Sequence, residues 1–284
     1  MSRSRSRSSS RSYKKDTIKS MLDSIDHVFV INLEKAKDRK EKCLERLKLM
    51  GFPSHKIEII KATDRSEESW KDALIEIGLI DKRDRSQINV LDLLSPKYQK
   101  KIKSSEKQSE KRKKEVLHYK AVIGTFFSHL RIWAKIGLMQ PFKYCLILED
   151  DMKPSSRWNG TTADRLFNKV PYVPLLLLGH CYSQPDFKHE RPLETIEDID
   201  NILVSWFTQC LHAYLVTTTF GLMIRGSYQQ IFPISVPVDE WLPKFLLKNT
   251  IPFYIFEKQL INQDLDFESD IQITMDKDKD MFKD

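Results

Sequence analysis

Three consecutive acidic residues, Glu149-Asp150-Asp151, directly follow the apolar run from Tyr144 to Leu148. The run is short and continuous, which indicates a strand buried on both faces of a sheet. Three carboxylates at the end of such a strand repel one another unless a cation or a shared proton compensates their charge. The simplest chemistry is a divalent metal that binds through oxygen and carries a phosphorylated ligand.

The two outer acids are the strongest candidates for that chemistry. Residues two apart on a strand point to the same side, so Glu149 and Asp151 are predicted to face together. We expect one to face a nucleotide ribose and the other to hold the metal, which acts as a Lewis acid on a departing diphosphate. The carboxyl end of a strand is also the usual ligand site in open α/β sheets. The structural alternative is a turn or a helix N-cap that leads into the next segment.

The elements that position these acids follow from the hydrophobic pattern. Residues 27–33 and 57–60 are typical of buried strands, and residues 38–50 carry apolar positions at helical spacing. Strand, helix and strand within about forty residues predict a βαβ unit, and therefore a parallel sheet. The expected fold class is α/β, with a mainly parallel central sheet flanked by helices. Further helices are predicted at 67–77 and from 121 to about 140, and further strands at 144–148, 173–178, 212–217 and 252–256.

One folded domain, residues 24–275, is expected between two polar ends. Residues 1–23 begin with an alternating Arg/Ser tract that cannot offset the ordering entropy of folding, which predicts a disordered tail. Residues from about 95 to 118 are rich in Lys, Ser, Glu and Gln, which predicts a mobile basic surface insertion within the domain. Residues 276–284 form a polar C-terminal tail.

Composition narrows the class of protein. The 284 residues, 40% of them hydrophobic, are enough to bury a sizeable core, and the net charge of +7 is concentrated in the N-terminal tail and the insertion. No apolar run in the sequence approaches a membrane span of about 18 residues, and the tail lacks the apolar segment of a secretory signal. The cysteines have no metal-ligand or disulfide-framework spacing, which favours a reduced, cytoplasmic location. They are Cys43, Cys145, Cys181 and Cys210.

A series of sequence blocks in one fixed order carries a family resemblance over roughly residues 26–272. The blocks are Val30-Ile31-Asn32-Leu33 with Asp38-Arg39, then Ala62-Thr63-Asp64-Arg65, then Gly124 to Trp133 with Ser128-His129 inside it, then the acids at 149–151, then His212 to Val216, then Pro237 to Pro243, and a closing segment from Leu260 to Ile271. Together they resemble glycosyltransferase family 25, which includes bacterial lipopolysaccharide galactosyltransferases and animal procollagen galactosyltransferases. Several blocks in one order are far more specific than any single one.

The resemblance implies a GT-A-type nucleotide-sugar-binding fold and a hexosyltransferase that uses UDP-galactose or UDP-glucose. It further implies Mn²⁺ or another divalent cation, and an acceptor hydroxyl on a protein, such as hydroxylysine in a collagen-like chain, or on a glycan. Two positions depart from the family pattern: Lys35 stands where Arg is common, and Arg65 replaces the usual Gly. Lys lacks the planar fork of Arg for a phosphate contact, and Arg tolerates positive φ less well than Gly.

By the same resemblance, most candidate site residues lie at the nucleotide. Asp151 and Glu149 are the expected metal ligands, and one of Asn262, Gln263, Asp264 or Asp266 is a candidate for a further one. The structural alternatives are a helix cap, a surface charge or a turn for the charged residues before residue 65, and a packed core histidine in the helix. The expected nucleotide-binding residues are Asn32, Asp38, Arg39, Asp64, Ser128, His129, Glu149 and Asp150.

Two further acids, Asp239 and Glu240, follow Pro237-Val238 and precede Trp241. Transfer with inversion needs a general base that takes the proton of the acceptor hydroxyl while the nucleotide leaves on the opposite face. We assign that catalytic role to this pair, with Asp239 as the base. The alternative is that Asp239 caps a helix that begins at Trp241.

Two other classes of function are weighed against the transferase. One is a catalytically inactive scaffold or RNA-associated protein, in which nucleic acid is bound only through the basic Arg/Ser tail. In that class the tail is an RNA contact or a phosphorylation target, whereas the simpler interpretation is a solvated tail. The other is a metal-dependent phosphodiesterase, which is disfavoured because a two-metal site needs more ligands than one acidic cluster supplies.

Overall fold

The computed structural model describes residues 20–103, 110–139, 144–159, 163–164, 167–168, 173–180, 194–195, 202–205, 210–251, 253–256 and 258–267. The predicted C-terminal tail at 276–284 and nearly all of the predicted Arg/Ser tail lie outside these ranges. The folded region begins slightly earlier than predicted, because Met21 is only 1% exposed and packs into the core from a short helix.

Helices and strands alternate along the first part of the chain and along the last. The α-helices are α1 (Met21–Ser24), α2 (Lys37–Leu49), α3 (Glu67–Glu76), α4 (Pro96–Lys103), α5 (Glu110–Ile136), α7 (Thr218–Gly226), α8 (Tyr228–Ile231) and α9 (Val238–Lys248), and the 3-10 turns are Ser54–Lys56, Lys82–Asp84 and Val90–Leu93. The strands are β1 (Ile25–Asn32), β2 (Ile57–Lys61), β3 (Tyr144–Glu149), β4 (Met152–Pro154), β5 (Leu175–Gly179), β6 (Glu194–Thr195), β7 (Ile202–Ser205), β8 (Ala213–Thr217), β9 (Phe253–Phe256) and β10 (Ile261–Gln263).

In the described part of the chain, eight strands form one sheet in the order β2-β1-β3-β8-β5-β9-β7-β6. The neighbours β2, β1 and β3 pair in parallel, as do β5 and β9. Strand β8 is antiparallel to β3 and β5, and β7 is antiparallel to β9 and β6. The other six strands therefore run in one direction, which confirms the predicted mainly parallel α/β sheet. A separate two-stranded ladder pairs β10 with β4.

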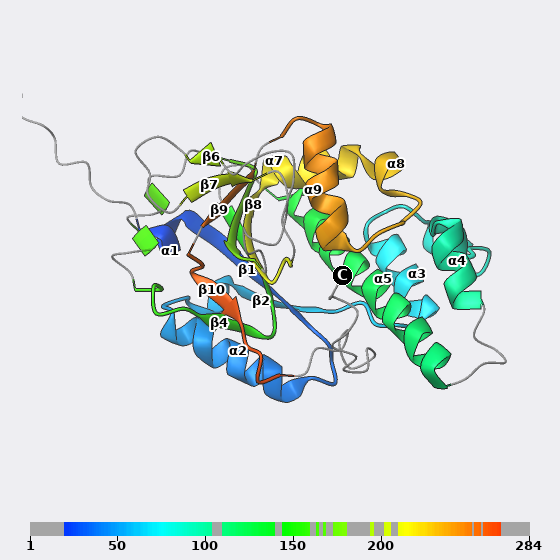
Figure 1. The fold of residues 1–284 in the computed structure, drawn as a ribbon, viewed down its shortest axis with the longest axis horizontal. Helices are drawn as coiled ribbons and strands as arrows, with labels where there is room; N and C mark the ends of the chain where they lie inside the picture. The colour runs from blue at the N-terminus through cyan, green and yellow to red at the C-terminus, as the bar shows by residue number, and fades with distance from the viewer. Residues whose placement is uncertain are drawn as a thin grey trace, which may run out of the picture.

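Both faces of the sheet are buried, as the continuous apolar strands predict. Along β3, Cys145 and Ile147 pack into the core under α5, α7 and α9, whereas Leu146 and Leu148 pack into the core on the other face. The second core includes Cys43 and Leu47 of α2. Figure 1 shows the resulting layers, with α2 on one side of the sheet and α5 and α9 on the other.

The region from about 95 to 118 differs from its prediction. Where it is described it is helical, since it contains α4 and the first turns of α5, which begins eleven residues before the predicted start at 121 (121 − 110). The composition obscures two apolar anchors four residues apart, Tyr98 and Ile102, which are 3% and 5% exposed and pack against the main core. Spacing of i and i+4 places both on one face of a helix, so the lysines of α4 occupy the remaining face.

Among the residues that the structure describes, no helix combines the length and apolar character needed to cross a membrane.

Candidate functional site

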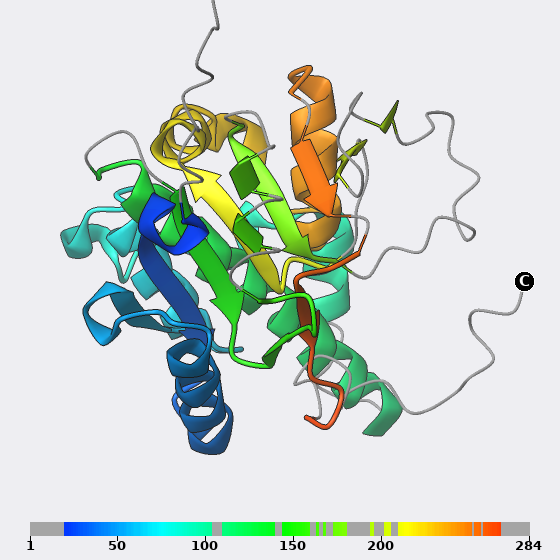
Figure 2. The same cartoon turned by 90° about the vertical axis from the view of Figure 1, so that its left-hand side faces the viewer.

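A cavity of about 660 Å³ opens at the carboxyl ends of β1, β2 and β3. Because these neighbouring strands are parallel, the residues that follow each of them meet at one edge of the sheet. In Figure 2, α2 and α5 project on either side of this edge. The lining residues that the sequence predicted are Arg39, Asp64, Ser128, His129, Glu149, Asp150 and Asp151.

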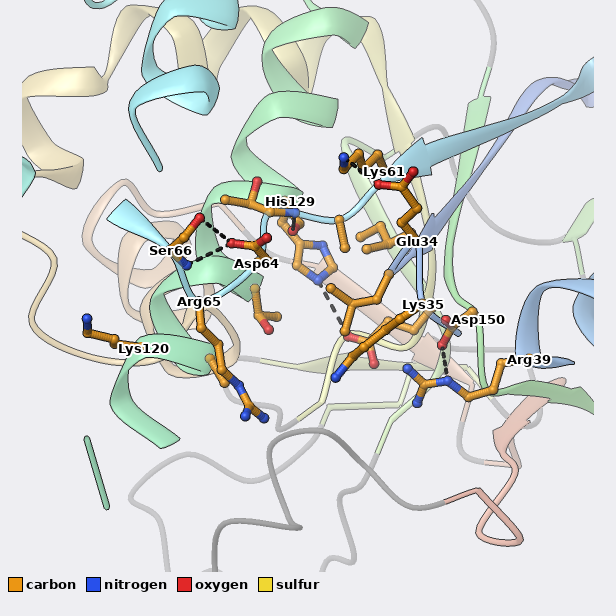
Figure 3. Close-up of a pocket in the computed structure, with 18 of the residues that line it drawn as sticks. Glu34, Lys35, Arg39, Lys61, Asp64, Arg65, Ser66, Lys120, His129 and Asp150 are labelled. Atoms are coloured by element: carbon orange, nitrogen blue, oxygen red, sulfur yellow. Dashed lines mark hydrogen bonds and ion pairs between the residues drawn. The ribbon is translucent and has the colours of Figure 1, made fainter. Parts of the chain in front are cut away.

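Asp150 is a buried, fully paired acid. Its carboxylate accepts a hydrogen bond from Asn32 Nδ2 at 2.6 Å and forms an ion pair with Arg39 Nε at 3.3 Å, and the residue is 5% exposed. Asn32 also donates to the Ala36 carbonyl at 3.0 Å, which ties the end of β1 to the start of α2. Asp150 thus holds Arg39 at the cavity wall, as Figure 3 shows. Asp38, by contrast, is an exposed acid in the first turn of α2 and does not line the cavity.

Asp151 has one carboxylate oxygen in use and one without a partner. Its Oδ2 accepts a hydrogen bond from Gln263 Nε2 at 2.8 Å. Its Oδ1 is buried and has no hydrogen-bond partner within the described ranges. Burial, and then the charge of Glu149, raises the pKa of the Asp151 carboxyl. An orphaned buried carboxylate oxygen at a cavity wall indicates a missing cation or proton.

A neighbouring histidine, His129, favours the ionised form of Glu149. Burial opposes ionisation of this carboxyl, but the facing imidazole of His129 outweighs it and lowers the pKa of Glu149. The His129 Nε2 to Glu149 Oε1 distance is 3.5 Å. The Glu149 side chain is 30% exposed, so it is open to a ligand in the cavity. Glu149 and Asp151 both line the cavity, which therefore contains one acid whose pKa is lowered and one whose pKa is raised.

Ser128 and Asp64 shape the cavity wall opposite the acids. The Ser128 hydroxyl donates to the Gly124 carbonyl and accepts from the Thr63 amide, both at 2.8 Å. A Cβ on Gly124 would lie 2.5 Å from the Thr63 carbonyl, so α5 can approach the end of β2 this closely only with glycine there. The Asp64 carboxylate accepts hydrogen bonds from the amide and hydroxyl of Ser66, which caps α3.

Basic side chains surround the rest of the cavity, and sequence reasoning missed two of them. Lys61 is the last residue of β2, and Lys120 lies in α5 one turn before Gly124. A lysine at the carboxyl end of a parallel strand is the signal that would have identified Lys61. The lining also contains five acids, so the cavity offers these cationic groups to a diphosphate within a wall of mixed charge. The basic lining residues are Lys35, Arg39, Lys61, Arg65 and Lys120 (Figure 3).

A second cavity of about 240 Å³ adjoins the first, and Thr125 and Glu149 line both. Asp239 also lines it and accepts a hydrogen bond from the Cys210 amide at 3.3 Å. Burial raises the pKa of the Asp239 carboxyl, against the lowering effect of that amide. Glu240 does not line either cavity and pairs with Lys244 at 3.2 Å.

The acids at 239 and 240 belong to a helix rather than a preceding loop. Helix α9 begins at Val238, three residues before the predicted start at Trp241, so both acids lie in its first turn. Acids are favoured there because the unpaired amides of a helix N-terminus carry partial positive charge. The sequence prediction was wrong on this boundary because Pro237 is the residue before the helix, a position that the pattern of apolar residues does not mark.

Among the candidates for a further metal ligand, Gln263 places its side chain on the Asp151 carboxylate, whereas Asp264 meets Asp151 through the backbone, its amide donating to the Asp151 carbonyl at 2.7 Å. The Asp264 side chain instead points to α2, where it pairs with Arg46 and, at 3.2 Å, with Lys42. Burial disfavours its charge, but these two cations outweigh that effect and hold the pKa of Asp264 well below its usual range. Asp264 is therefore a structural ion pair that fixes the end of β10 against α2.

This ion pair predicts a pH-dependent loss of stability in an Asp264→Asn variant. A depressed pKa contributes stability that is present above the ordinary Asp range and is lost as pH falls through the folded-state pKa, so the variant should be less stable by about 2 kcal/mol at pH 7. Urea denaturation at pH 7 and near pH 3 measures the change, which should shrink in acid. Asp266→Asn, at a neighbouring exposed acid, is the control. An equal loss at both pH values would contradict this role.

One cysteine departs from the predicted reduced state. Cys210 is disulfide-bonded. Cys43 and Cys145 are buried free thiols, and burial raises the pKa of each to about 12, which makes them inert packing residues. Disulfides are typical of oxidising compartments. The cytoplasmic location therefore stays a prediction that the cysteines no longer favour.

The mainly parallel sheet, flanked by helices and with acids at the carboxyl end of β3, is consistent with a GT-A-like fold. The family model of glycosyltransferase family 25 (LPS biosynthesis protein) matches residues 25–199, more than half of the 284 residues. The chain therefore belongs to glycosyltransferase family 25, as its sequence blocks predicted.

Two curated relatives, both named glycosyltransferase 25 family member, extend the match toward the C-terminus. The protein from Drosophila pseudoobscura pseudoobscura is 24% identical over 227 residues, which is 77% of this chain and 30% of that protein. The Drosophila melanogaster protein is 24% identical over 228 residues, 78% of this chain and again 30% of the relative. The chain thus spans about a third of the length of these relatives.

Proposed function

We propose that this protein transfers galactose or glucose from a UDP-sugar to a hydroxyl of a protein or glycan acceptor, with a divalent metal and with inversion. The observation that carries the proposal is the pair of adjoining cavities that share Glu149. The larger one is lined by Lys and Arg as well as by acids and contains the orphaned Asp151 oxygen, and the smaller one contains the half-buried acid Asp239. A donor diphosphate and an acceptor hydroxyl need these two environments side by side.

The larger cavity suits the nucleotide diphosphate. Lysine and arginine side chains in its lining are suited to compensate the charge of a diphosphate, and Arg39 is held in place by Asp150. Asp64, fixed by Ser66, offers its carboxylate edge to the ribose or uracil. The identity of the base and of the sugar rests on the family resemblance, since UDP-galactose and UDP-glucose differ at one hydroxyl only.

The acids at the end of β3, Glu149 and Asp151, are suited to bind a divalent cation, preferably Mn²⁺. Within the described ranges, no three His, Cys, Asp or Glu side chains are arranged to hold a metal by themselves. Mg²⁺-like ions, however, are commonly bound by one or two carboxylates with substrate phosphates and water completing the shell. Asp151, with its free Oδ1, and Glu149 would hold the ion, and the Gln263 amide beside them is the further polar group. When bound, the ion stabilises negative charge on the departing diphosphate.

The smaller cavity suits the acceptor. Asp239 is the proposed base: the residue is half-buried, its carboxylate accepts a hydrogen bond from the Cys210 amide, and it lines the smaller cavity together with Glu149. It takes the proton of the acceptor hydroxyl as that oxygen attacks the sugar carbon, and attack from the side opposite the nucleotide gives inversion. Glu149, which lines both cavities, lies where donor sugar and acceptor meet. Collagen-like hydroxylysine and a glycan hydroxyl are the proposed acceptors, on the family resemblance alone.

Thermal unfolding with nucleotides tests the donor side of the proposal. UDP together with Mn²⁺ at about 100 times its dissociation constant should stabilise the protein by about 2.7 kcal/mol, because a ligand that binds only the folded state favours it. For a domain of this size that corresponds to a rise in Tm of about 5 °C or more. UDP-galactose, UDP-glucose, ADP with Mn²⁺, and Mn²⁺ alone complete the panel.

A matched pair of variants locates the binding. Lys61→Ala, at the cavity, should reduce the shift in Tm, whereas Lys82→Ala, an exposed lysine outside the cavity lining, should leave it unchanged. A panel in which no uridine nucleotide shifts the Tm, with or without metal, would contradict the proposed donor. Sugar transfer from the UDP-sugar that gives the largest shift then tests the reaction itself.

A further inference from the structure

A chain of buried polar groups leads from the core to Glu149. Trp133 Nε1 lies 2.9 Å from Tyr214 Oη, and Tyr214 Oη lies 2.6 Å from His129 Nδ1. On its other side, His129 Nε2 faces Glu149 Oε1 at 3.5 Å. Trp133, Tyr214 and His129 are each 0% exposed. Neither Trp133 nor Tyr214 belongs to the cavity lining, so neither contacts a ligand there.

The direction of the hydrogen bonds follows from the donors. An indole N–H can only donate, so the Tyr214 oxygen accepts from Trp133. Burial raises the pKa of Tyr214 well above its ordinary value, so the hydroxyl keeps its single proton. That proton has His129 Nδ1 as its acceptor. If Nδ1 carried a proton instead, the Tyr214 hydrogen would be buried without a partner, at a cost of about 1–3 kcal/mol.

This direction fixes the imidazole. With Nδ1 as acceptor, the ring carries its proton on Nε2, the atom that faces Glu149. Packing holds the ring in that orientation, since its centroid lies 5.9 Å from that of Trp133 and 5.7 Å from that of Tyr214. Trp133 in turn stacks on Trp241 of α9, with centroids 6.2 Å apart. In Figure 3, a dashed line marks the contact between the His129 ring and the Glu149 carboxylate.

We propose that Tyr214 and Trp133 are positioning residues for the transfer reaction: they hold His129 in the tautomer that carries its proton on Nε2, the nitrogen that lies 3.5 Å from Glu149 Oε1. Through His129 they orient the carboxylate that lines both cavities, where the donor sugar meets the acceptor. The inference rests on the proposed function for the importance of Glu149, and on the buried contacts alone for the tautomer. Removing an outer hydrogen-bond partner of this kind lowers activity by about 10- to 100-fold.

The kinetic experiment compares single and double variants. Tyr214→Phe deletes only the hydroxyl, and should lower kcat for sugar transfer by about 10-fold while the affinity for UDP changes little. His129→Gln should lower kcat at least as much. If Tyr214 acts through His129, adding Tyr214→Phe to His129→Gln should have little further effect, because groups that act as one unit are not additive. Effects that multiply would overturn the proposal, as would full activity in Tyr214→Phe.

Tyr144→Phe is the matched control for loss of a buried hydroxyl. The Tyr144 hydroxyl accepts from the Val173 amide at 3.2 Å in the core on the other face of the sheet. This variant should lose stability without the loss of kcat. A matching fall in kcat in Tyr144→Phe would show that the Tyr214 effect is merely structural.

A spectroscopic measurement keeps the inference testable if no sugar is transferred. Imidazole ¹⁵N NMR distinguishes the two neutral tautomers. The His129 signals are assigned as those that are missing from the spectrum of His129→Gln. If that variant does not fold, they are assigned as those that shift in Tyr214→Phe. The wild-type ring should be protonated on Nε2 alone. Protonation on Nδ1, whether alone or with Nε2, would overturn the inference. Failure of sugar transfer with the expected tautomer would contradict the proposed function but not the hydrogen-bond chain.

Discussion

Replacing Asp151 with asparagine is expected to reduce sugar transfer by about 10³-fold, the scale on which a group that stabilises transition-state charge acts. Asp151 Oδ1 is buried at the cavity wall without a partner within the described ranges, and we propose that the metal fills that position. Asparagine keeps the shape and can still contact Gln263, but it removes the negative charge that binds a cation. The transfer rate and the metal-dependent part of the UDP thermal shift should fall together.

The same substitution should leave the fold at least as stable as the wild type. Burial beside Glu149 raises the pKa of Asp151, so the folded state binds this proton more tightly than the unfolded state does. Such a group lowers stability as pH rises from the ordinary Asp range through the folded-state pKa. Asp151→Asn removes that loss, so its Tm should match or exceed the wild-type value at pH 8 in the absence of metal. Asp84→Asn, at an exposed acid, controls for the change in net charge. Undiminished transfer in Asp151→Asn would end the metal assignment.

The sheet was predictable from the sequence where strands are long and apolar. The continuous runs at 25–32, 144–149 and 213–217 are buried on both faces. A strand buried on both faces is apolar at nearly every position, and this pattern is visible in the sequence. Strands β4, β6, β7 and β10 were missed because they are two to four residues long. A ladder of that length is set by the neighbouring strand, so its own residues carry little signal.

The location of the site was predictable from the sequence, but the role of each acid within it was not. Asp150 and Asp151 are adjacent acids with the same burial, yet one is neutralised and the other is not. The difference comes from Arg39, which forms the ion pair with Asp150, and from Asn32, which lies 118 residues away in the sequence and donates a hydrogen bond to it. Likewise, Gln263 reaches Asp151 while Asp264 is turned toward Arg46. Contacts of this range depend on the tertiary fold, and the order of residues in one strand does not reveal them.

The two acids at the start of α9 also differ in their surroundings. This difference leads to the second prediction with a large expected effect. Asp239→Asn should lower the rate of transfer to the acceptor by about 10²- to 10⁴-fold, the usual contribution of a general base. Its carboxylate lines the smaller cavity next to Glu149, whereas the Glu240 carboxylate is engaged by Lys244 outside both cavities. Glu240→Gln should therefore retain most of the activity, although the sequence alone made both acids candidates for the catalytic role.

Donor binding and pH separate loss of a base from loss of structure. Asp239→Asn should bind UDP with Mn²⁺ as the wild type does, because the acid does not line the larger cavity. Burial raises the pKa of Asp239, so the wild-type rate should rise with pH above the ordinary Asp range as the base loses its proton, and the residual rate of the variant should not follow that rise. Transfer kinetics across pH measure both. If Glu240→Gln lost as much activity as Asp239→Asn, or if the variant kept the wild-type pH profile, the proton would have to pass to another group.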